Sequence, residues 1–226
     1  MNEKTFRNCV YIVIAILIII FFTKDIPFFK DDFYENIKIV DNPSNILVLV
    51  NKNNKLPEDF IPNDLQPINL ACSNADKKLV GIVKEKFEQL CHDANLLGYR
   101  IVAVSAYRDY NYQKELYENY VLEKGLEYAD KCSARPGHSE HQTGLAVDVM
   151  GSNEDYDEFE KSPEFEWMKD NAHNYGFILR YPENKEKITG FKYEPWHYRY
   201  VGEEVAKIIY ENKLTLEEYY EKYLNK

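Results

Sequence analysis

The sequence has no concentration of positive charge. Its 226 residues carry 38 acidic and 28 basic side chains, a formal net charge of −10, and no long run of lysine or arginine. Binding to a nucleic-acid backbone requires a dense positive surface that displaces counterions, so this balance disfavours a nucleic acid as the partner. The sequence also has no visible internal repeat, and nothing in it indicates an oligomeric state.

Cysteine is scarce, and no disulfide framework is expected. Cys72, Cys91 and Cys132 are the cysteines beyond the N-terminal apolar segment, an odd number that cannot pair completely within the chain. Cys72 and Cys91 lie near opposite ends of one predicted helix, roughly 28 Å apart, which is too far for a bond. Cys91 and Cys132 could meet, but buried free thiols are the simpler interpretation.

An apolar segment without a small-x-small cleavage site begins the chain. Residues 9–22 are uninterrupted by polar side chains and would form a helix of roughly 21 Å behind the basic residues Lys4 and Arg7. This pattern favours an uncleaved signal anchor at residues 1–23, with single-pass attachment to the cell membrane and an extracytoplasmic domain. Cleavage and secretion are the alternative.

The rest of the chain is expected to form one domain, residues 46–226, behind a stalk of residues 24–45. Apolar residues make up 45% of the sequence and nineteen are tyrosines, which is enough for a core. Strand-like and helical patterns alternate irregularly, which favours an α+β fold. Strands are expected at residues 46–51, 101–104, 144–150, 177–181 and 192–201. Helices are expected at residues 73–98, 109–124, 162–176, 201–211 and 215–224, and loops at residues 126–140 and 182–190.

Residues 136–149, PGHSEHQTGLAVDV, contain a first candidate metal site. His141 and Asp148 are separated by glycine and small residues that let a loop turn into a strand, and both side chains are zinc ligands. A carboxylate between two valines of a buried strand is unfavourable unless it is paired or metal-bound. The alternative is an aspartate on a solvated face. His138 could bind metal with His141 on a helix turn, but the preceding proline and glycine favour a loop.

A second candidate site lies in residues 193–202, YEPWHYRYVG. Glu194 and His197 offer a general base and a ligand, as a zinc hydrolase with three protein ligands and an open position requires. Residues three apart in a regular strand point to opposite faces, so both side chains reach one metal only if the strand is irregular. Proline at position 195 predicts such an irregularity at Pro195 and Trp196. The alternative is an aromatic strand with a surface glutamate and a buried histidine.

Arg108 follows the buried strand predicted at residues 101–104, at a loop position where its guanidinium could bind a carboxylate or an oxyanion. A solvated loop arginine is the alternative. His92 and His173 fall on predicted helices and are not expected to be ligands.

Together these motifs resemble the VanY-type D-alanyl-D-alanine carboxypeptidases. The shared patterns are SxYR at residues 105–108, SxHxxGxAxD at residues 139–148 and ExWH at residues 194–197, within a similarity that spans residues 46–210. One departure is Ala106, where relatives often have glycine. The resemblance implies a zinc D,D-peptidase-like fold, in which a small antiparallel sheet has flanking helices.

The resemblance also implies one zinc ion per chain and a set of site residues. Glu194 would be the catalytic base, Arg108 would contact the substrate or the developing oxyanion, and Ser139 and Gln113 would line the substrate site. The implied zinc ligands are His141, Asp148 and His197.

The implied activity is removal of the C-terminal D-amino acid from peptidoglycan stem pentapeptides. The same family contains L,D-carboxypeptidases that trim tetrapeptides, and no motif decides between the two because the preference depends on pocket shape. A third interpretation is a non-catalytic wall-binding domain that keeps zinc for structure. Structural zinc usually has four protein ligands, whereas three are expected here.

Overall fold

The computed structural model describes residues 33–152 and 155–225, and residues 33–226 belong to one compact unit. One finding corrects the expected single-pass localisation in the membrane. None of the helices in the described ranges is long and apolar enough to cross a membrane. The predicted anchor itself, residues 1–23, lies outside the described residues.

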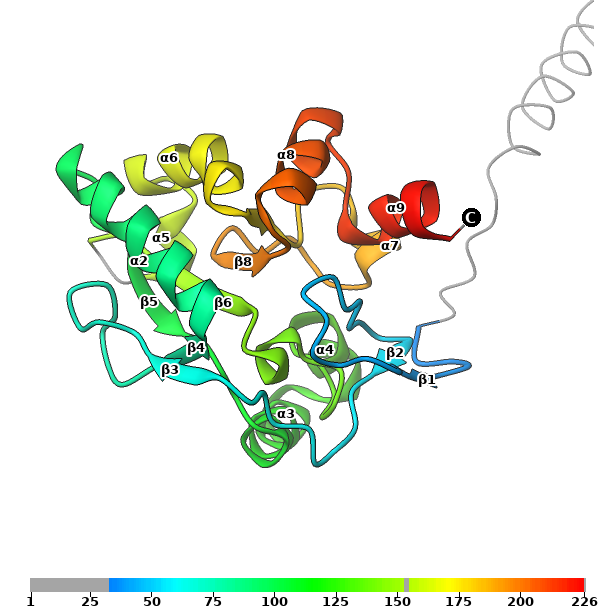
Figure 1. The fold of residues 1–226 in the computed structure, drawn as a ribbon. Coiled ribbons are helices and arrows are strands. Elements are labelled where there is room, and N and C mark those ends of the chain that lie inside the picture. Colours follow the sequence, from blue (N-terminus) through cyan, green and yellow to red (C-terminus); the bar gives the residue numbers. More distant parts are fainter. Residues whose placement is uncertain (1–32, 153–154, 226) are drawn as a thin grey trace, which may run out of the picture. The chain divides into compact units, whose positions relative to one another are not determined.

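A four-stranded antiparallel sheet, in the order β5-β6-β8-β7, lies at the centre of the fold (Figure 1). Its strands are β5 (Val102–Ser105), β6 (Ala146–Met150), β7 (Phe177–Leu179) and β8 (His197–Tyr200). Two shorter pairs flank it: β1 (Lys38–Ile39) with β2 (Asn54–Lys55), and β3 (Leu65–Pro67) with β4 (Lys78–Val80). The predicted mixture of helices with a small antiparallel sheet is confirmed.

The register of the sheet collects polar side chains on one face. Ser105 of β5 is the partner of Asp148 of β6, which is also the partner of His197 of β8. Because side chains alternate along a strand, the neighbours of these residues point to the opposite face and enter the core. Those core residues are Val147, Val149, Tyr198 and Tyr200.

Helices cover the core face and both ends of the sheet. The longest, α2 (Gly81–Leu96), buries Val83, Phe87, Leu90, Cys91 and Ala94. In Figure 1, α3 (Tyr110–Lys124) and α4 (Leu126–Cys132) lie at the end of the molecule opposite α6 (Pro163–Asn171) and α8 (Glu203–Asn212). The shorter elements are η1 (Glu140–Thr143), α5 (Tyr156–Phe159), η2 (Ala172–Tyr175), α7 (Glu186–Thr189), α9 (Leu216–Tyr219) and η3 (Tyr220–Leu224).

The helix predicted at residues 73–98 is too long at its start, and this error explains a second one. Helix α2 begins only at Gly81, because residues 78–80 pair with β3 as a strand. The chain therefore turns back after Cys72, whose Cα lies 6.0 Å from that of Cys91, and the two form a disulfide. The prediction that these cysteines are too far apart is wrong, and Cys132 is the free cysteine of the described residues.

Three other predicted segments differ from the structure. Residues 46–51 form no strand, since the carbonyl oxygens of Ile46 and Val48 accept hydrogen bonds from Arg199 instead of from a neighbouring strand. The predicted loops at residues 126–140 and 182–190 contain the short helices α4 and α7.

The described part of the expected stalk lies against the domain. Strand β1 pairs with β2, and the ring of Tyr34 contacts the guanidinium of Arg135, whose Cζ lies 3.9 Å from the ring centroid. The same ring makes an edge contact with His138. The contacts of the domain therefore begin near residue 33.

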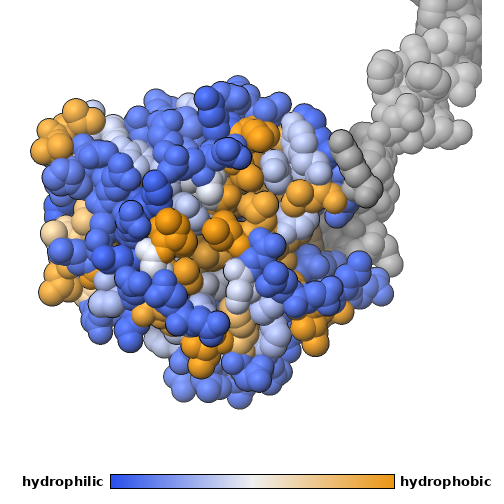
Figure 2. Space-filling model, in the orientation of Figure 1, coloured by the Kyte–Doolittle hydropathy of each residue, from blue (hydrophilic) through white to orange (hydrophobic). Residues whose placement is uncertain are grey.

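The surface is mainly hydrophilic on the face that Figure 2 shows, with apolar residues in smaller patches. This agrees with the excess of acidic side chains, which gives a net charge of −10. Single exposed apolar residues are common on the surfaces of folded domains.

Candidate metal centre and active site

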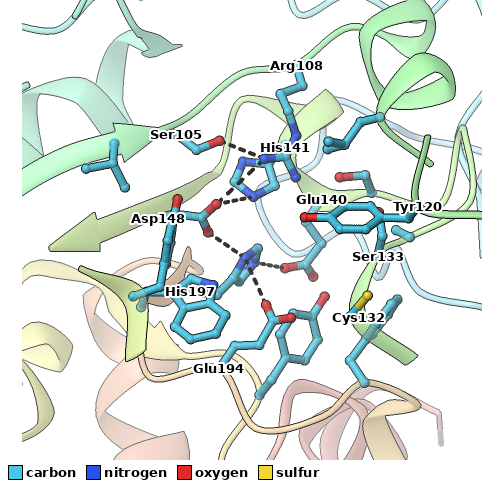
Figure 3. Close-up of a pocket in the computed structure, with 18 of the residues that line it drawn as sticks. Ser105, Arg108, Tyr120, Cys132, Ser133, Glu140, His141, Asp148, Glu194 and His197 are labelled. Carbon is cyan, nitrogen blue, oxygen red and sulfur yellow. Dashed lines mark hydrogen bonds and ion pairs between the residues drawn. The ribbon is translucent and has the colours of Figure 1, made fainter. Parts of the chain in front are cut away.

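His141, Asp148 and His197 meet on the polar face of the sheet (Figure 3). Their ligand atoms all lie within 4.8 Å of one another, and all three side chains are buried. His141 comes from η1, Asp148 from β6 and His197 from β8. The structure therefore brings together the three predicted ligands from two separate parts of the sequence.

Two local features aim these side chains at one point. Gly144 ends η1 with φ of 66°, a left-handed conformation that glycine adopts easily, and the chain then enters β6. Pro195 and Trp196 form a turn before β8 begins at His197, which confirms the predicted irregularity. Because of this turn, Glu194 and His197 line the same pocket.

The orientation of His141 suits a metal ligand. Its Nδ1 donates a hydrogen bond of 2.7 Å to the carbonyl oxygen of Ala106, so its Nε2 presents a lone pair 3.3 Å from Asp148 Oδ2. Burial and the nearby charge of Arg108 lower the pKa of His141 to about 4. The ring is therefore neutral near pH 7, as coordination requires.

His197 faces a carboxylate at each of its nitrogens. Its Nδ1 lies 2.9 Å from Asp148 Oδ1, and its Nε2 lies 3.5 Å from Glu140 Oε2. Burial lowers the pKa of His197, but the interactions with the carboxylates of Asp148 and Glu140 outweigh burial and raise it to about 9. A proton or a metal cation is thus favoured between Nδ1 and Asp148.

Glu194 is a buried acid at the edge of the cluster. Its side chain lines the pocket, and its Oε2 lies 3.9 Å from His197 Nδ1. Burial raises the pKa of Glu194 to about 7, and in the described part of the chain its carboxylate accepts no hydrogen bond. A carboxyl group with a pKa near neutrality can both accept and donate a proton.

Arg108 is fixed at another side of the cluster. Its Nη1 donates to Ser105 Oγ at 2.7 Å and lies 3.6 Å from Asp148 Oδ2, while its Nε donates to Gln113 Oε1 at 3.1 Å. Gln113 is only 1% exposed and holds Arg108 from behind, whereas Ser139 lines the pocket itself.

The wall of the pocket contains residues whose place there was not predicted from the sequence. The aromatic side chains Tyr120, Tyr156 and Trp196 line it, together with Lys192, and Trp196 makes an edge contact with Tyr156 at 5.0 Å between centroids. Because Tyr120, Tyr156 and Trp196 come from distant parts of the sequence, their convergence could not be read from spacing.

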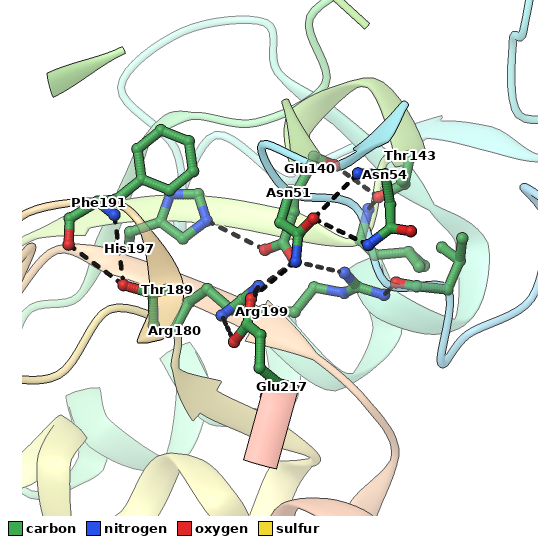
Figure 4. Close-up of polar contacts among 12 residues, drawn as sticks. Asn51, Asn54, Glu140, Thr143, Arg180, Thr189, Phe191, His197, Arg199 and Glu217 are labelled. Carbon is green, nitrogen blue, oxygen red and sulfur yellow. Dashed lines mark hydrogen bonds and ion pairs between the residues drawn. The ribbon is translucent and has the colours of Figure 1, made fainter. Parts of the chain in front are cut away.

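A buried charged network behind His197 was also missed. Glu140, Arg180 and Arg199 are all 0–1% exposed, and both arginines contact Glu140 (Figure 4). Each arginine stands in a segment otherwise typical of a buried strand, FILRY or HYRY. A charge in such a segment is a signal of a buried partner, and it could have led to this network.

The remaining histidines lie outside the cluster. His138 Nδ1 is 2.9 Å from the carbonyl oxygen of Asn51, and His173 stacks on Tyr210. Among the described residues, the one group suited to hold a metal ion is the cluster of His141, Asp148 and His197.

The donor set fits zinc. Two imidazole nitrogens and one carboxylate oxygen are the usual ligands of a catalytic zinc site, which keeps a further position open. Asp148 Oδ1 and His197 Nε2 are buried without a hydrogen bond in the structure, which is unfavourable unless a cation or proton compensates them.

The chain is similar to known carboxypeptidases. The family model "VanY: D-alanyl-D-alanine carboxypeptidase" matches residues 76–203. The chain is 42% identical over 206 residues to the putative carboxypeptidase YodJ of Bacillus subtilis (strain 168). This match covers 85% of this chain and 76% of that protein. Relatives include proteins named as D-alanyl-D-alanine carboxypeptidases and as LD-carboxypeptidases.

Two solved structures have a similar fold. The LD-carboxypeptidase LdcB, whose structure was used to explain peptidoglycan recognition, matches with a TM-score of 0.78 and 42% identity, over 83% of this chain and 91% of that one. A vancomycin-resistance D,D-pentapeptidase VanY in complex with Zn(II) matches with a TM-score of 0.66 and 34% identity, over 76% of this chain and 97% of that one.

Proposed function

Because the chain belongs to the VanY family of D-alanyl-D-alanine carboxypeptidases, we propose that it is a zinc-dependent carboxypeptidase that removes the C-terminal D-amino acid from peptidoglycan stem pentapeptides. The observation that carries the proposal is the meeting of His141, Asp148 and His197 within 4.8 Å, with Glu194 at the edge of the cluster. One zinc ion per chain is proposed at these three ligands.

Each residue of the site has a proposed role in the reaction. A zinc ion held by the cluster would polarise the scissile carbonyl and lower the pKa of water. Glu194 accepts a proton from the attacking water and then donates it to the departing amino group. Its pKa of about 7 suits both steps. Once this proton is delivered, the terminal amino acid leaves.

Arg108 is proposed to recognise the free carboxylate that distinguishes a C-terminal residue from an internal one. Its guanidinium lines the pocket and is held by Ser105 and Gln113, so little side-chain freedom is lost on binding. The same charge can stabilise the oxyanion that develops at the scissile carbonyl. Ser139 lies on the pocket wall and is proposed as a further substrate contact, while Gln113 acts through Arg108.

An L,D-carboxypeptidase is the second candidate function. The specific observation in its favour is the similarity to the LD-carboxypeptidase LdcB, at a TM-score of 0.78 and 42% identity. The zinc ligands and Glu194 would act in the same way in both reactions. The two activities differ in the residue before the scissile bond, a D-residue in the pentapeptide and an L-residue in the tetrapeptide, and the shape of the pocket decides which of them is accepted.

A direct test is incubation of the zinc-loaded protein with a defined stem pentapeptide and a defined stem tetrapeptide. Release of D-alanine from the pentapeptide, absent in Glu194→Gln, is the expected result. Release from the tetrapeptide alone would support the L,D-carboxypeptidase instead. If neither peptide is cleaved while the protein binds cell walls, both enzymatic functions are rejected in favour of a binding domain.

A further inference from the structure

The imidazole of His197 has an acid on the side away from the pocket as well as in front of it. Its Nδ1 faces Asp148, and its Nε2 lies 3.5 Å from Oε2 of Glu140. Both Glu140 Oε2 and His197 Nε2 are buried, and neither forms a hydrogen bond with the described residues. Each atom therefore has an unused hydrogen-bonding position, and the two atoms lie 3.5 Å apart.

The orientation of the Glu140 carboxylate is fixed by two arginines. Its Oε1 accepts hydrogen bonds of 2.8 Å from Arg180 Nε and from Arg199 Nη1 (Figure 4). Arg180 is held in turn by Glu217, with contacts of 2.9 and 2.7 Å. Arg199 is held by backbone carbonyl oxygens, including that of Val48 at 2.8 Å. The oxygen that faces the arginines and the oxygen that faces His197 therefore cannot exchange places freely.

We propose that Glu140 is a positioning residue that keeps a proton on Nε2 of His197, so that Nδ1 presents its lone pair to the metal. The inference rests on the proposed zinc site. A neutral imidazole carries one N–H, and the group that accepts this N–H decides which nitrogen remains free for coordination. Since a carboxylate only accepts hydrogen bonds, Glu140 selects the form of His197 that can bind zinc through Nδ1.

The substitution Glu140→Gln tests this role because the amide has a direction. The amide oxygen must face the two arginines, both of which are donors, so the amide nitrogen faces His197 Nε2. Nε2 would then have to accept a hydrogen bond, which moves the imidazole proton to Nδ1. That proton stands where the metal should bind, so zinc affinity falls even though the side chain keeps its size.

Glu217→Gln is the matched control. Glu217 also pairs with Arg180, at 2.7 Å, but no contact between Glu217 and His197 is found in the described structure. If Glu140 served only to neutralise buried arginine charge, the two substitutions would weaken zinc binding alike. Under the proposal, Glu217→Gln leaves the zinc dissociation constant nearly unchanged.

The first measurement is the zinc dissociation constant of the wild type and both variants, by competition with a chromogenic chelator. We expect about 10–100-fold weaker binding for Glu140→Gln, the usual effect of losing such a hydrogen bond to a ligand. Equal affinities of wild type and Glu140→Gln, or equal losses in both variants, would overturn the inference. If the wild type binds no zinc, the proposed function itself fails.

The second measurement needs no variant and remains decisive if Glu140→Gln does not fold. Nitrogen-15 NMR of the zinc-loaded wild type identifies the protonated and the coordinating nitrogen of each histidine. The proposal expects His197 to coordinate through Nδ1 and to carry its proton on Nε2, with a shift typical of a hydrogen bond to a carboxylate. Coordination through Nε2 would reject it.

Discussion

Two glutamates flank the ring of His197, and their surroundings are opposite. Behind the ring, burial raises the pKa of Glu140, but the charges of Arg180 and Arg199 outweigh burial and hold that pKa far below its ordinary value. In front of the ring, Glu194 has no such partner, and burial raises its pKa to about 7. Two side chains of the same type thus differ in role: Glu140 is a hydrogen-bond acceptor that stays ionised, and Glu194 is suited to carry a proton.

This difference separates two tasks that both depend on one histidine. The rear network fixes geometry, because a carboxylate that stays ionised near neutral pH remains a hydrogen-bond acceptor. The front acid is suited to chemistry, because a group that titrates near neutrality exchanges protons with little change in free energy. Such opposed environments around neighbouring acids are a common sign of a division between structural and catalytic roles.

Removal of zinc is expected to have the largest effect. Dialysis against a strong chelator should reduce D-alanine release to background, because the front side then lacks the group that activates water. Readdition of one equivalent of zinc should restore activity, while circular dichroism of the metal-free protein checks that it stays folded. Undiminished cleavage by metal-free protein, verified by elemental analysis, would contradict the proposed zinc dependence.

Glu194→Gln should lower kcat by about 10²–10⁴-fold, the usual contribution of a general acid–base group. The zinc dissociation constant should change little, which is the reverse of the pattern expected for Glu140→Gln. Steady-state kinetics and chelator competition on the same preparations measure both quantities. A variant that loses zinc together with activity would show that Glu194 also supports the metal.

Arg108→Lys should lower kcat/KM by about 10–100-fold, mostly through a higher KM. Lysine keeps the charge but loses the planar fork that holds Ser105 and Gln113 and binds a carboxylate at two points. A substrate whose terminal carboxylate is converted to an amide supplies the control. Wild type and Arg108→Lys should have similar kcat/KM values for this substrate. An unchanged KM for the free acid would remove Arg108 from carboxylate recognition.

The last comparison concerns the stability of the metal-free protein and not its activity. Glu194→Gln and Glu140→Gln are expected to change the free energy of unfolding in opposite directions. The folded-state pKa of Glu194 is raised from 4.5 to about 7, so its ionisation destabilises the fold progressively between those pH values, by about 3 kcal/mol in total. Glu194→Gln should therefore be more stable than wild type at pH 7.5 and lose that advantage near pH 4.5. Chemical denaturation at both pH values measures the change.

Glu140→Gln should behave in the opposite way. The pKa of Glu140 is lowered in the folded state, so its contribution is present above its ordinary pKa of 4.5 and is lost as the pH falls below it. Removal of this buried partner of two arginines should reduce the free energy of unfolding by about 3–5 kcal/mol at pH 7. A stability equal to that of wild type at pH 7 would mean that the network contributes little to the fold.

The sequence predicted an element correctly where its local pattern and its contacts in the fold favour the same structure. The helices predicted from residues 162 and 215 begin there, each capped by the side chain of Ser162 or Thr215, and the strand that carries Asp148 is present. The start of α2 could not be predicted in the same way, because residues 78–80 have a helical pattern yet pair with β3. That pairing joins two segments of the chain, and a local pattern does not reveal it. Because residues 78–80 form β4 and not the first turn of a helix, Cys72 can approach Cys91 and form the disulfide.

The candidate site was predictable where a motif contains the residue and not where only the fold brings it close. His141, Asp148, Glu194 and His197 stand in short patterns whose chemistry can be read directly from the sequence. The partners of Glu140 are distant in sequence and approach it only when β8 pairs with both β6 and β7. Such pairs need knowledge of the sheet order, which periodicity does not supply.

The register between β6 and β8 also has a meaning for folding. Asp148 and His197 become neighbours only when these two strands pair, and they are far apart in the chain. A chain in which β8 has not yet joined the sheet holds no more than two of the three proposed ligands, and contacts of this range form late because they close long loops. Tight zinc binding would then require that β8 has paired with β6. The time course of zinc binding during refolding would therefore measure when β8 joins the sheet.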